Sequence, residues 1–123
     1  MILVDTSIWV DHLRTGSPEL ATLLLGNRIS VHDFVIGELA CGNLRNRREV
    51  LELLQSLPRL GSATNEEALF FIEQQQLMAR GIGYVDVHLL AAGALHGARL
   101  WTKDKRLKTV AEELGLAYAS ATH

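Results

Sequence analysis

The apolar residues of the chain follow two patterns that alternate along its length. The continuous apolar run at 2–4 is typical of a buried strand, and the short, mostly apolar segments at 29–31, 98–102 and 117–119 are interpreted as further strands. Between them, apolar residues recur at helical spacing, which predicts amphipathic helices. The helical patterns begin after Thr6 or Ser7, run from Ser17 to Gly26, cover 35–40 and 50–57, and run from Thr64 to Gly81, from Asp86 to His96, and from 107 to Gly115. Alternating strands and helices predict an α/β fold with a central parallel sheet.

Local signals sharpen several of these boundaries. Thr64 to Glu67 matches a capping box, so a helix is expected to begin there. The preceding amphipathic stripe ends before Pro58, which cannot continue a helix. We expect these two helices to be neighbours. Asp86 is expected to cap or open its leucine- and alanine-rich helix.

Length and composition favour one domain over residues 1–123. The chain is 123 residues long and 48% hydrophobic, which is enough for one core and too little for two. It contains no run of about 18 apolar residues, and Met1 leads into an apolar strand without a basic segment. We therefore expect no membrane span, no signal peptide and a cytoplasmic location. Cys41 stands among small apolar residues and is expected to be buried.

Four carboxylates stand where this architecture can bring distant segments together. Asp5 and Asp104 each follow a predicted strand, Asp86 stands at a helix start, and Glu38 lies off the apolar stripe of its helix. In open α/β sheets, ligands bind beyond the carboxyl ends of the strands. Two like charges about 4 Å apart repel by about 4 kcal/mol at an effective dielectric near 20, so four gathered carboxylates require a compensating cation. Oxygen ligands favour Mg²⁺ or Mn²⁺, and the chain has no paired cysteines or His-x-x-x-His motif for zinc.

Such a site is suited to the hydrolysis of phosphodiester bonds. A bound divalent cation can lower the pKa of water, orient a phosphate and stabilise the charge of the leaving oxygen. Thr6 and Thr102 stand next to strand-end acids or their loops and are candidates for orienting water or phosphate, although Thr6 can equally act as a helix cap. Lys103 and Lys105 flank Asp104 and are candidates for phosphate contacts, with a solvated helix face as the alternative.

The charge balance permits a polyanionic substrate. The net charge of −2 argues against general nucleic-acid affinity, but neutralising the four acids leaves ten of the fourteen acidic residues against twelve basic ones. The histidines show no ligand spacing and are expected at surfaces or helix ends: His12, His32, His88, His96 and His123. The aromatic residues of apolar segments are expected in packing rather than in base stacking: Trp9, Phe34, Phe70, Phe71 and Trp101.

Taken together, these motifs resemble the PIN-domain ribonucleases, and among them the VapC-type toxins of bacterial toxin-antitoxin pairs. The resemblance covers essentially the whole chain in the right order. It rests on Val4-Asp5-Thr6-Ser7, Gly37-Glu38-Leu39, Asp86 followed by Leu89-Leu90-Ala91-Ala92, and Thr102-Lys103-Asp104. One departure is that many members carry a further aspartate, followed by phenylalanine, at the place of Leu107, which puts a second metal position in doubt.

The resemblance implies a PIN-like three-layer fold, with a central parallel sheet of four to five strands flanked by helices. It implies Mg²⁺ or Mn²⁺ bound by Asp5, Glu38, Asp86 and Asp104, endonucleolytic cleavage of RNA, a VapB-type antitoxin partner and a homodimer. RNA as the substrate comes from the resemblance alone, because hydrolysis by metal-activated water does not require the 2′-hydroxyl.

Two other functions stay open at the level of sequence. A receiver-like phosphoacceptor domain also places an aspartate at a strand end with a threonine and Lys103 nearby, but it gives Glu38 and Asp86 no role. A catalytically idle PIN-like module that binds RNA is the second alternative. Metal uptake by the acidic cluster separates this idle binder from a nuclease.

Overall fold

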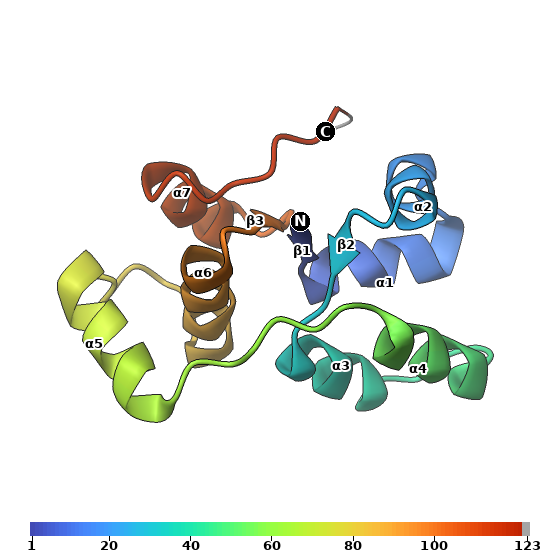
Figure 1. Ribbon diagram of the computed structural model, residues 1–123, viewed down its shortest axis with the longest axis horizontal. Helices are drawn as coiled ribbons and strands as arrows, with labels where there is room; N and C mark the ends of the chain where they lie inside the picture. The colour runs from blue at the N-terminus through green and yellow to red at the C-terminus, as the bar shows by residue number, and fades with distance from the viewer. Residues whose placement is uncertain (122–123) are drawn as a thin grey trace.

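Strands and helices alternate along the chain as the apolar patterns predict. The computed structural model describes residues 1–121, so His123 and the end of the predicted domain lie outside the described residues. The elements in chain order are β1 (Ile2–Val4), α1 (Thr6–Thr15), α2 (Pro18–Leu25), β2 (Ile29–Ser30), α3 (Asp33–Ala40), α4 (Arg47–Ser56), α5 (Asn65–Gln75), α6 (Tyr84–His96), β3 (Arg99–Trp101) and α7 (Lys105–Glu113) (Figure 1).

The strands form a parallel sheet in the order β2-β1-β3. Within residues 1–121 it has three strands rather than the predicted four to five. A single parallel bridge extends each edge, from Val31 to Arg59 and from Leu100 to Ala117. The predicted strand at 117–119 is therefore only a bridge, because its pairing with β3 does not continue beyond Leu100.

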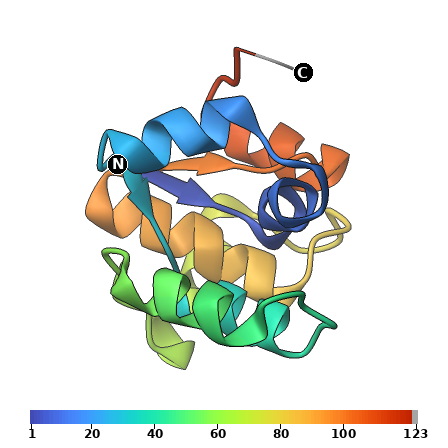
Figure 2. The same cartoon turned by 90° about the vertical axis from the view of Figure 1, so that its right-hand side faces the viewer.

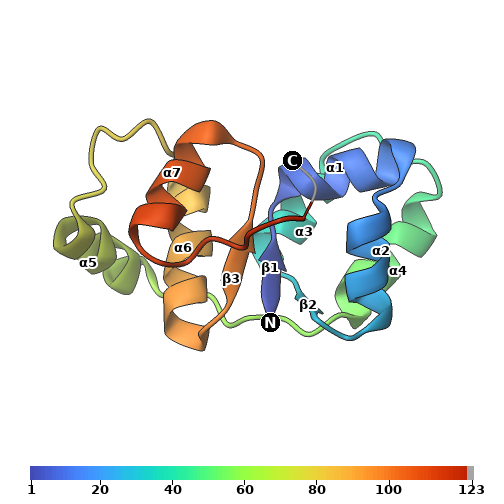
Figure 3. The same ribbon diagram turned by 90° about the horizontal axis from the view of Figure 1, so that it is seen from above.

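Helices lie on both sides of the sheet. Helices α1 to α4 occupy one side and α5 to α7 the other, which confirms the predicted three-layer arrangement (Figures 1 and 3). Turning the molecule by 90° shows α6 running alongside the strands (Figure 2). The carboxyl ends of β1 and β3 lead into the starts of α1 and α7, so these two helices begin at the same edge of the sheet.

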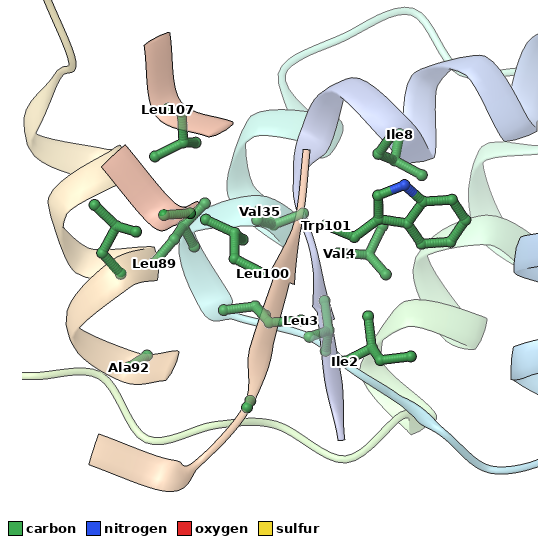
Figure 4. Packing of buried hydrophobic residues seen from close by; sticks show 14 of the residues in the cluster. Ile2, Leu3, Val4, Ile8, Val35, Leu89, Ala92, Leu100, Trp101 and Leu107 are labelled. Atoms are coloured by element: carbon green, nitrogen blue, oxygen red, sulfur yellow. The ribbon is translucent and has the colours of Figure 1, made fainter. Parts of the chain in front are cut away.

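The core fills the space between the sheet and both helical layers. Every residue of β1 is buried, as the continuous apolar run predicts. Leu89 and Leu107 pack on one side of the strands and Ile8 on the other (Figure 4). Gly93 lets α6 approach β3, since a Cβ atom there would lie 2.9 Å from the carbonyl oxygen of Ala98. This close packing fixes the position of α6 relative to the sheet.

Several local expectations are wrong. Helix α5 ends at Gln75 rather than near Gly81, because Gln76 takes a left-handed conformation (φ 54°) and its N–H closes the helix. Helices α4 and α5 are not neighbours but lie on opposite sides of the molecule (Figure 3). Cys41, which was expected to be buried, is exposed because it follows α3 at the C-cap.

No helix in residues 1–121 is long and apolar enough to cross a membrane.

Candidate active site

Asp5 lies at the centre of the candidate site. It follows β1 directly and caps α1, where its Oδ1 accepts a hydrogen bond from the Thr6 N–H at 2.7 Å. Its Oδ2 accepts hydrogen bonds from the Ser7 hydroxyl at 2.9 Å and the Thr102 hydroxyl at 2.7 Å. The residue is only 7% exposed. Because a buried carboxylate is costly without partners, these donors explain how its charge is tolerated there.

Thr102 connects Asp5 to Asp104. The hydroxyl that donates to Asp5 also accepts a hydrogen bond from the Asp104 N–H at 3.1 Å. Asp104 caps α7 by accepting from the Leu107 N–H at 3.0 Å, and it is exposed. The parallel pairing of β1 with β3 sets Val4 opposite Trp101, so the residues that follow these strands meet at one edge.

Glu38 joins the site through Thr6. The Thr6 hydroxyl donates to Glu38 Oε1 at 2.6 Å, and this contact links the start of α1 to the middle of α3. Glu38 is exposed, as its place off the apolar stripe predicts. Thr6 therefore contacts two of the four acids, with its N–H on Asp5 and its hydroxyl on Glu38.

Asp86 is the fourth acid, and its pKa depends on the charges of the other three. It stands in the first turn of α6, where its Oδ2 accepts a hydrogen bond from the Gly83 N–H at 3.1 Å. Burial raises the pKa of Asp86 most, the negative charges of Asp5, Asp104 and Glu38 raise it further, and the Gly83 hydrogen bond opposes these effects. The charges of carboxylates from three other segments thus contribute to the raised pKa of Asp86.

The donor chemistry of the four acids fits a hard divalent cation. All four side chains offer carboxylate oxygens, and a cation between them would offset the mutual repulsion that, after burial, contributes to the raised pKa of Asp86. As the side chains stand, no three Asp, Glu, His or Cys residues within 1–121 are placed to hold one ion. Each of the four carboxylates instead accepts a hydrogen bond from a protein group. An ion would therefore have to replace or share these hydrogen bonds.

The two candidate lysines differ in their surroundings. The Lys103 ammonium pairs with Asp11 at 2.6 Å, and the backbone N–H of Lys103 donates to the Ser7 hydroxyl at 3.3 Å. Lys105 is exposed at the first position of α7. Leu107 has a hydrocarbon side chain with no ligand atom, and it is completely buried in the core.

Sequence reasoning missed the contacts or the burial of three polar residues. Ser7 was considered only as a helix cap, yet its hydroxyl contacts Asp5. His32 and His88 are 0% and 3% exposed. The expectation of a surface or helix-end position is confirmed for His32, which is the N-cap of α3, and wrong for His88, which is buried within α6. The pKa of each is lowered, mainly by burial. The position of His32 directly after the apolar run 29–31 was the available signal, because a strand buried on both faces extends burial to its end.

The aromatic residues mostly follow the predicted packing role. Trp9 is fully buried and Trp101 is 6% exposed. Phe34 packs against the rings of His32 and His88, with ring centroids 4.9 and 4.8 Å apart. Phe70 is the exception, since it is 65% exposed on α5.

Comparison with known proteins assigns the family. Residues 2–113 match the family model of the PIN domain, so the chain belongs to the PIN domain family. Ribonuclease VapC32 of Mycobacterium tuberculosis is 46% identical over 120 residues, which cover 97% of each chain. This membership confirms the resemblance seen in the motifs and leaves the receiver-like alternative without support.

Solved structures share the fold at low sequence identity. A toxin-antitoxin complex from Klebsiella pneumoniae contains a chain that is 17% identical, with a TM-score of 0.64 and coverage of 85% of this chain and 88% of that one. PAE2754 from Pyrobaculum aerophilum is 16% identical, with a TM-score of 0.64 and coverage of 92% and 90%. These likenesses support the three-layer architecture.

Proposed function

We propose that the chain is a metal-dependent endoribonuclease that acts as the toxin of a toxin-antitoxin pair. The observation that carries the proposal is the meeting of four carboxylates at one edge of the sheet. Thr102 links Asp5 to Asp104, Thr6 links Asp5 to Glu38, and the charges of all three contribute to the raised pKa of Asp86. Relatedness supports the choice of RNA, since a protein 46% identical along almost its whole length bears the name ribonuclease. The products are expected to carry 5′-phosphate and 3′-hydroxyl ends.

The four acids are the proposed ligands of Mg²⁺ or Mn²⁺. When bound, such an ion supplies Lewis-acid chemistry and neutralises charge on the phosphate. Thr102 and Ser7 orient the Asp5 carboxylate through their hydroxyls, and Thr6 orients Glu38.

Two lysines that flank Asp104, the N-cap of α7, assist in binding the substrate. Lys103, held by Asp11, and the exposed Lys105 offer positive charge to the RNA backbone beside Asp104.

The proposed partners follow from the same family. A VapB-type antitoxin is expected to bind the chain, and the toxin-antitoxin complex from Klebsiella pneumoniae supports a partner of this class. We also propose a homodimer and action in the cytoplasm, where the RNA substrate is found.

The test is cleavage of single-stranded RNA by the purified chain with Mg²⁺ or Mn²⁺. Asp5→Asn should abolish cleavage while its circular dichroism spectrum stays native. Asp33→Asn is the matched control, because Asp33 is an exposed carboxylate whose partner is Arg59 rather than a member of the site. Chelation by EDTA should stop cleavage by the wild type. Undiminished cleavage by Asp5→Asn would refute the proposal, and RNA binding without cleavage would favour the idle module.

A further inference from the structure

A large groove lies beside the acidic site. It has a volume of about 1030 Å³ and runs between the α1–α2 connection, the start of α7 and the C-terminal segment 115–120. Thr102, which donates to Asp5, lines it together with Lys103. Figure 3 shows the C-terminal segment passing from α7 over β3 toward α1. The four acids do not line the groove, which adjoins the candidate catalytic centre through Thr102.

The C-terminal segment is fixed as a wall of this groove. The Tyr118 hydroxyl donates to Glu19 of α2 at 2.6 Å. The Tyr118 ring packs against Trp101 of β3, with centroids 5.1 Å apart. These contacts tie the segment to both sides of the groove, and the half-buried Tyr118 ring contributes to its lining.

The charge of the groove is opposite in sign to that of the whole chain. Its lining includes four basic residues, Arg99, Lys103, Lys105 and Lys108, against two acidic ones, Asp11 and Glu112. The chain as a whole carries −2. Positive charge thus lies beside the cluster of carboxylates. A polyanion that binds next to an acidic metal site requires such positive charge, because the carboxylates alone would repel its phosphates.

The four cations differ in their protein partners. Arg99 donates to the Gly115 carbonyl oxygen at 2.7 Å, and Lys103 pairs with Asp11. Lys105 and Lys108 are exposed, and within residues 1–121 neither forms an ion pair. Because they stand three positions apart on α7, their side chains share one face of the helix.

We propose that this groove binds the segment of single-stranded RNA that adjoins the scissile phosphate, with Lys105 and Lys108 on its backbone phosphates. The inference rests on the proposed ribonuclease function and adds the path of the substrate. A groove that combines positive charge with an aromatic side chain is typical of sites for single strands. At about 1030 Å³ it also reaches the upper limit of small-molecule pockets, which span about 300–1,000 Å³. An acidic protein segment is the competing occupant.

Salt dependence of RNA binding tests the proposal. The double variant Lys105→Gln/Lys108→Gln and the wild type are titrated with a labelled single-stranded RNA by fluorescence anisotropy in EDTA, which prevents cleavage. The slope of log K against log salt should become shallower by about 1.4 in the variant, because each phosphate contact to a single strand contributes about 0.7. An unchanged slope would overturn the proposal.

The matched control removes two positive charges elsewhere. Arg45, which precedes α4, and Arg48, in its first turn, are exposed and do not line the groove. Arg45→Gln/Arg48→Gln should keep the wild-type slope, and an equal loss in both double variants would assign the effect to net charge and refute a specific path. A wild type that binds RNA with the predicted slopes but fails to cleave it with Mg²⁺ or Mn²⁺ would refute the proposed function and leave the groove assignment standing.

Discussion

Replacing Thr102 by valine tests how the site holds its central carboxylate. Valine keeps the shape of threonine but lacks the hydroxyl, so Asp5 Oδ2 loses the donor at 2.7 Å and the Asp104 N–H loses its acceptor. The Thr6 N–H and the Ser7 hydroxyl still donate to Asp5. The Asp5 carboxylate therefore loses one of its three donors and keeps the other two.

The expected cost is about 2 kcal/mol of unfolding free energy. A hydrogen bond to a charged group contributes about 1.5–3 kcal/mol. The Asp104 N–H adds little, since it belongs to an exposed residue and can bind water. For a domain of this size, about 2 kcal/mol corresponds to a loss of about 8 °C in Tm. A chain with a stability of about 5–15 kcal/mol remains folded after this change.

Thermal and urea unfolding measure the effect. Thr102→Ser restores the hydroxyl and should recover most of the stability. Thr109→Val is the matched control, because the exposed Thr109 hydroxyl donates only to the Lys105 carbonyl oxygen, and it should change stability by less than about 0.5 kcal/mol. Cleavage of RNA should fall in Thr102→Val and return in Thr102→Ser. A Thr102→Val protein that unfolds at the wild-type midpoint would refute the role given to this hydrogen bond.

Two further predictions concern charge. Asp86→Asn removes one of four repelling charges, so the metal-free variant should be as stable as the wild type or more so. Mg²⁺ at about 100 times its Kd should raise the unfolding free energy of the wild type by about 2.7 kcal/mol, and the variant should lose this stabilisation. A metal-free variant that is clearly less stable than the wild type would contradict the reasoning. Burial and the Glu19 contact raise the pKa of Tyr118 to about 12, so its contribution to stability is complete below about pH 10 and disappears as the pH rises toward 12. The stability difference between the wild type and Tyr118→Phe, measured by urea unfolding, should therefore shrink over this range, and a constant difference would argue against the raised pKa.

Local chemistry explains most of what the sequence predicted. The apolar run 2–4 is β1, and the capping box from Thr64 to Glu67 is present with both of its hydrogen bonds. Asp104 and Asp86 occupy helix starts because a carboxylate there satisfies free N–H groups. The same residues face the candidate site, so their local capping role and their proposed functional role coexist.

The unpredicted features depend on contacts between distant segments. The hydrogen bond from Thr102 to Asp5 depends on the register of β3 against β1, which no local pattern specifies. Burial of His88 likewise depends on the packing of Phe34 against its ring. The separation of α4 from α5 follows from their placement on opposite sides of the sheet, although amphipathic stripes made them look like partners. Periodicity identifies the apolar face of a helix but not the surface that covers it.

A crystal of the protein soaked in Mn²⁺ and measured for anomalous scattering tests the central claim most directly. The account predicts an anomalous peak coordinated by oxygens from at least three of Asp5, Glu38, Asp86 and Asp104, and loss of that peak in Asp5→Asn. Manganese bound only at other positions, with these carboxylates retaining their present hydrogen bonds to protein groups, would contradict the account.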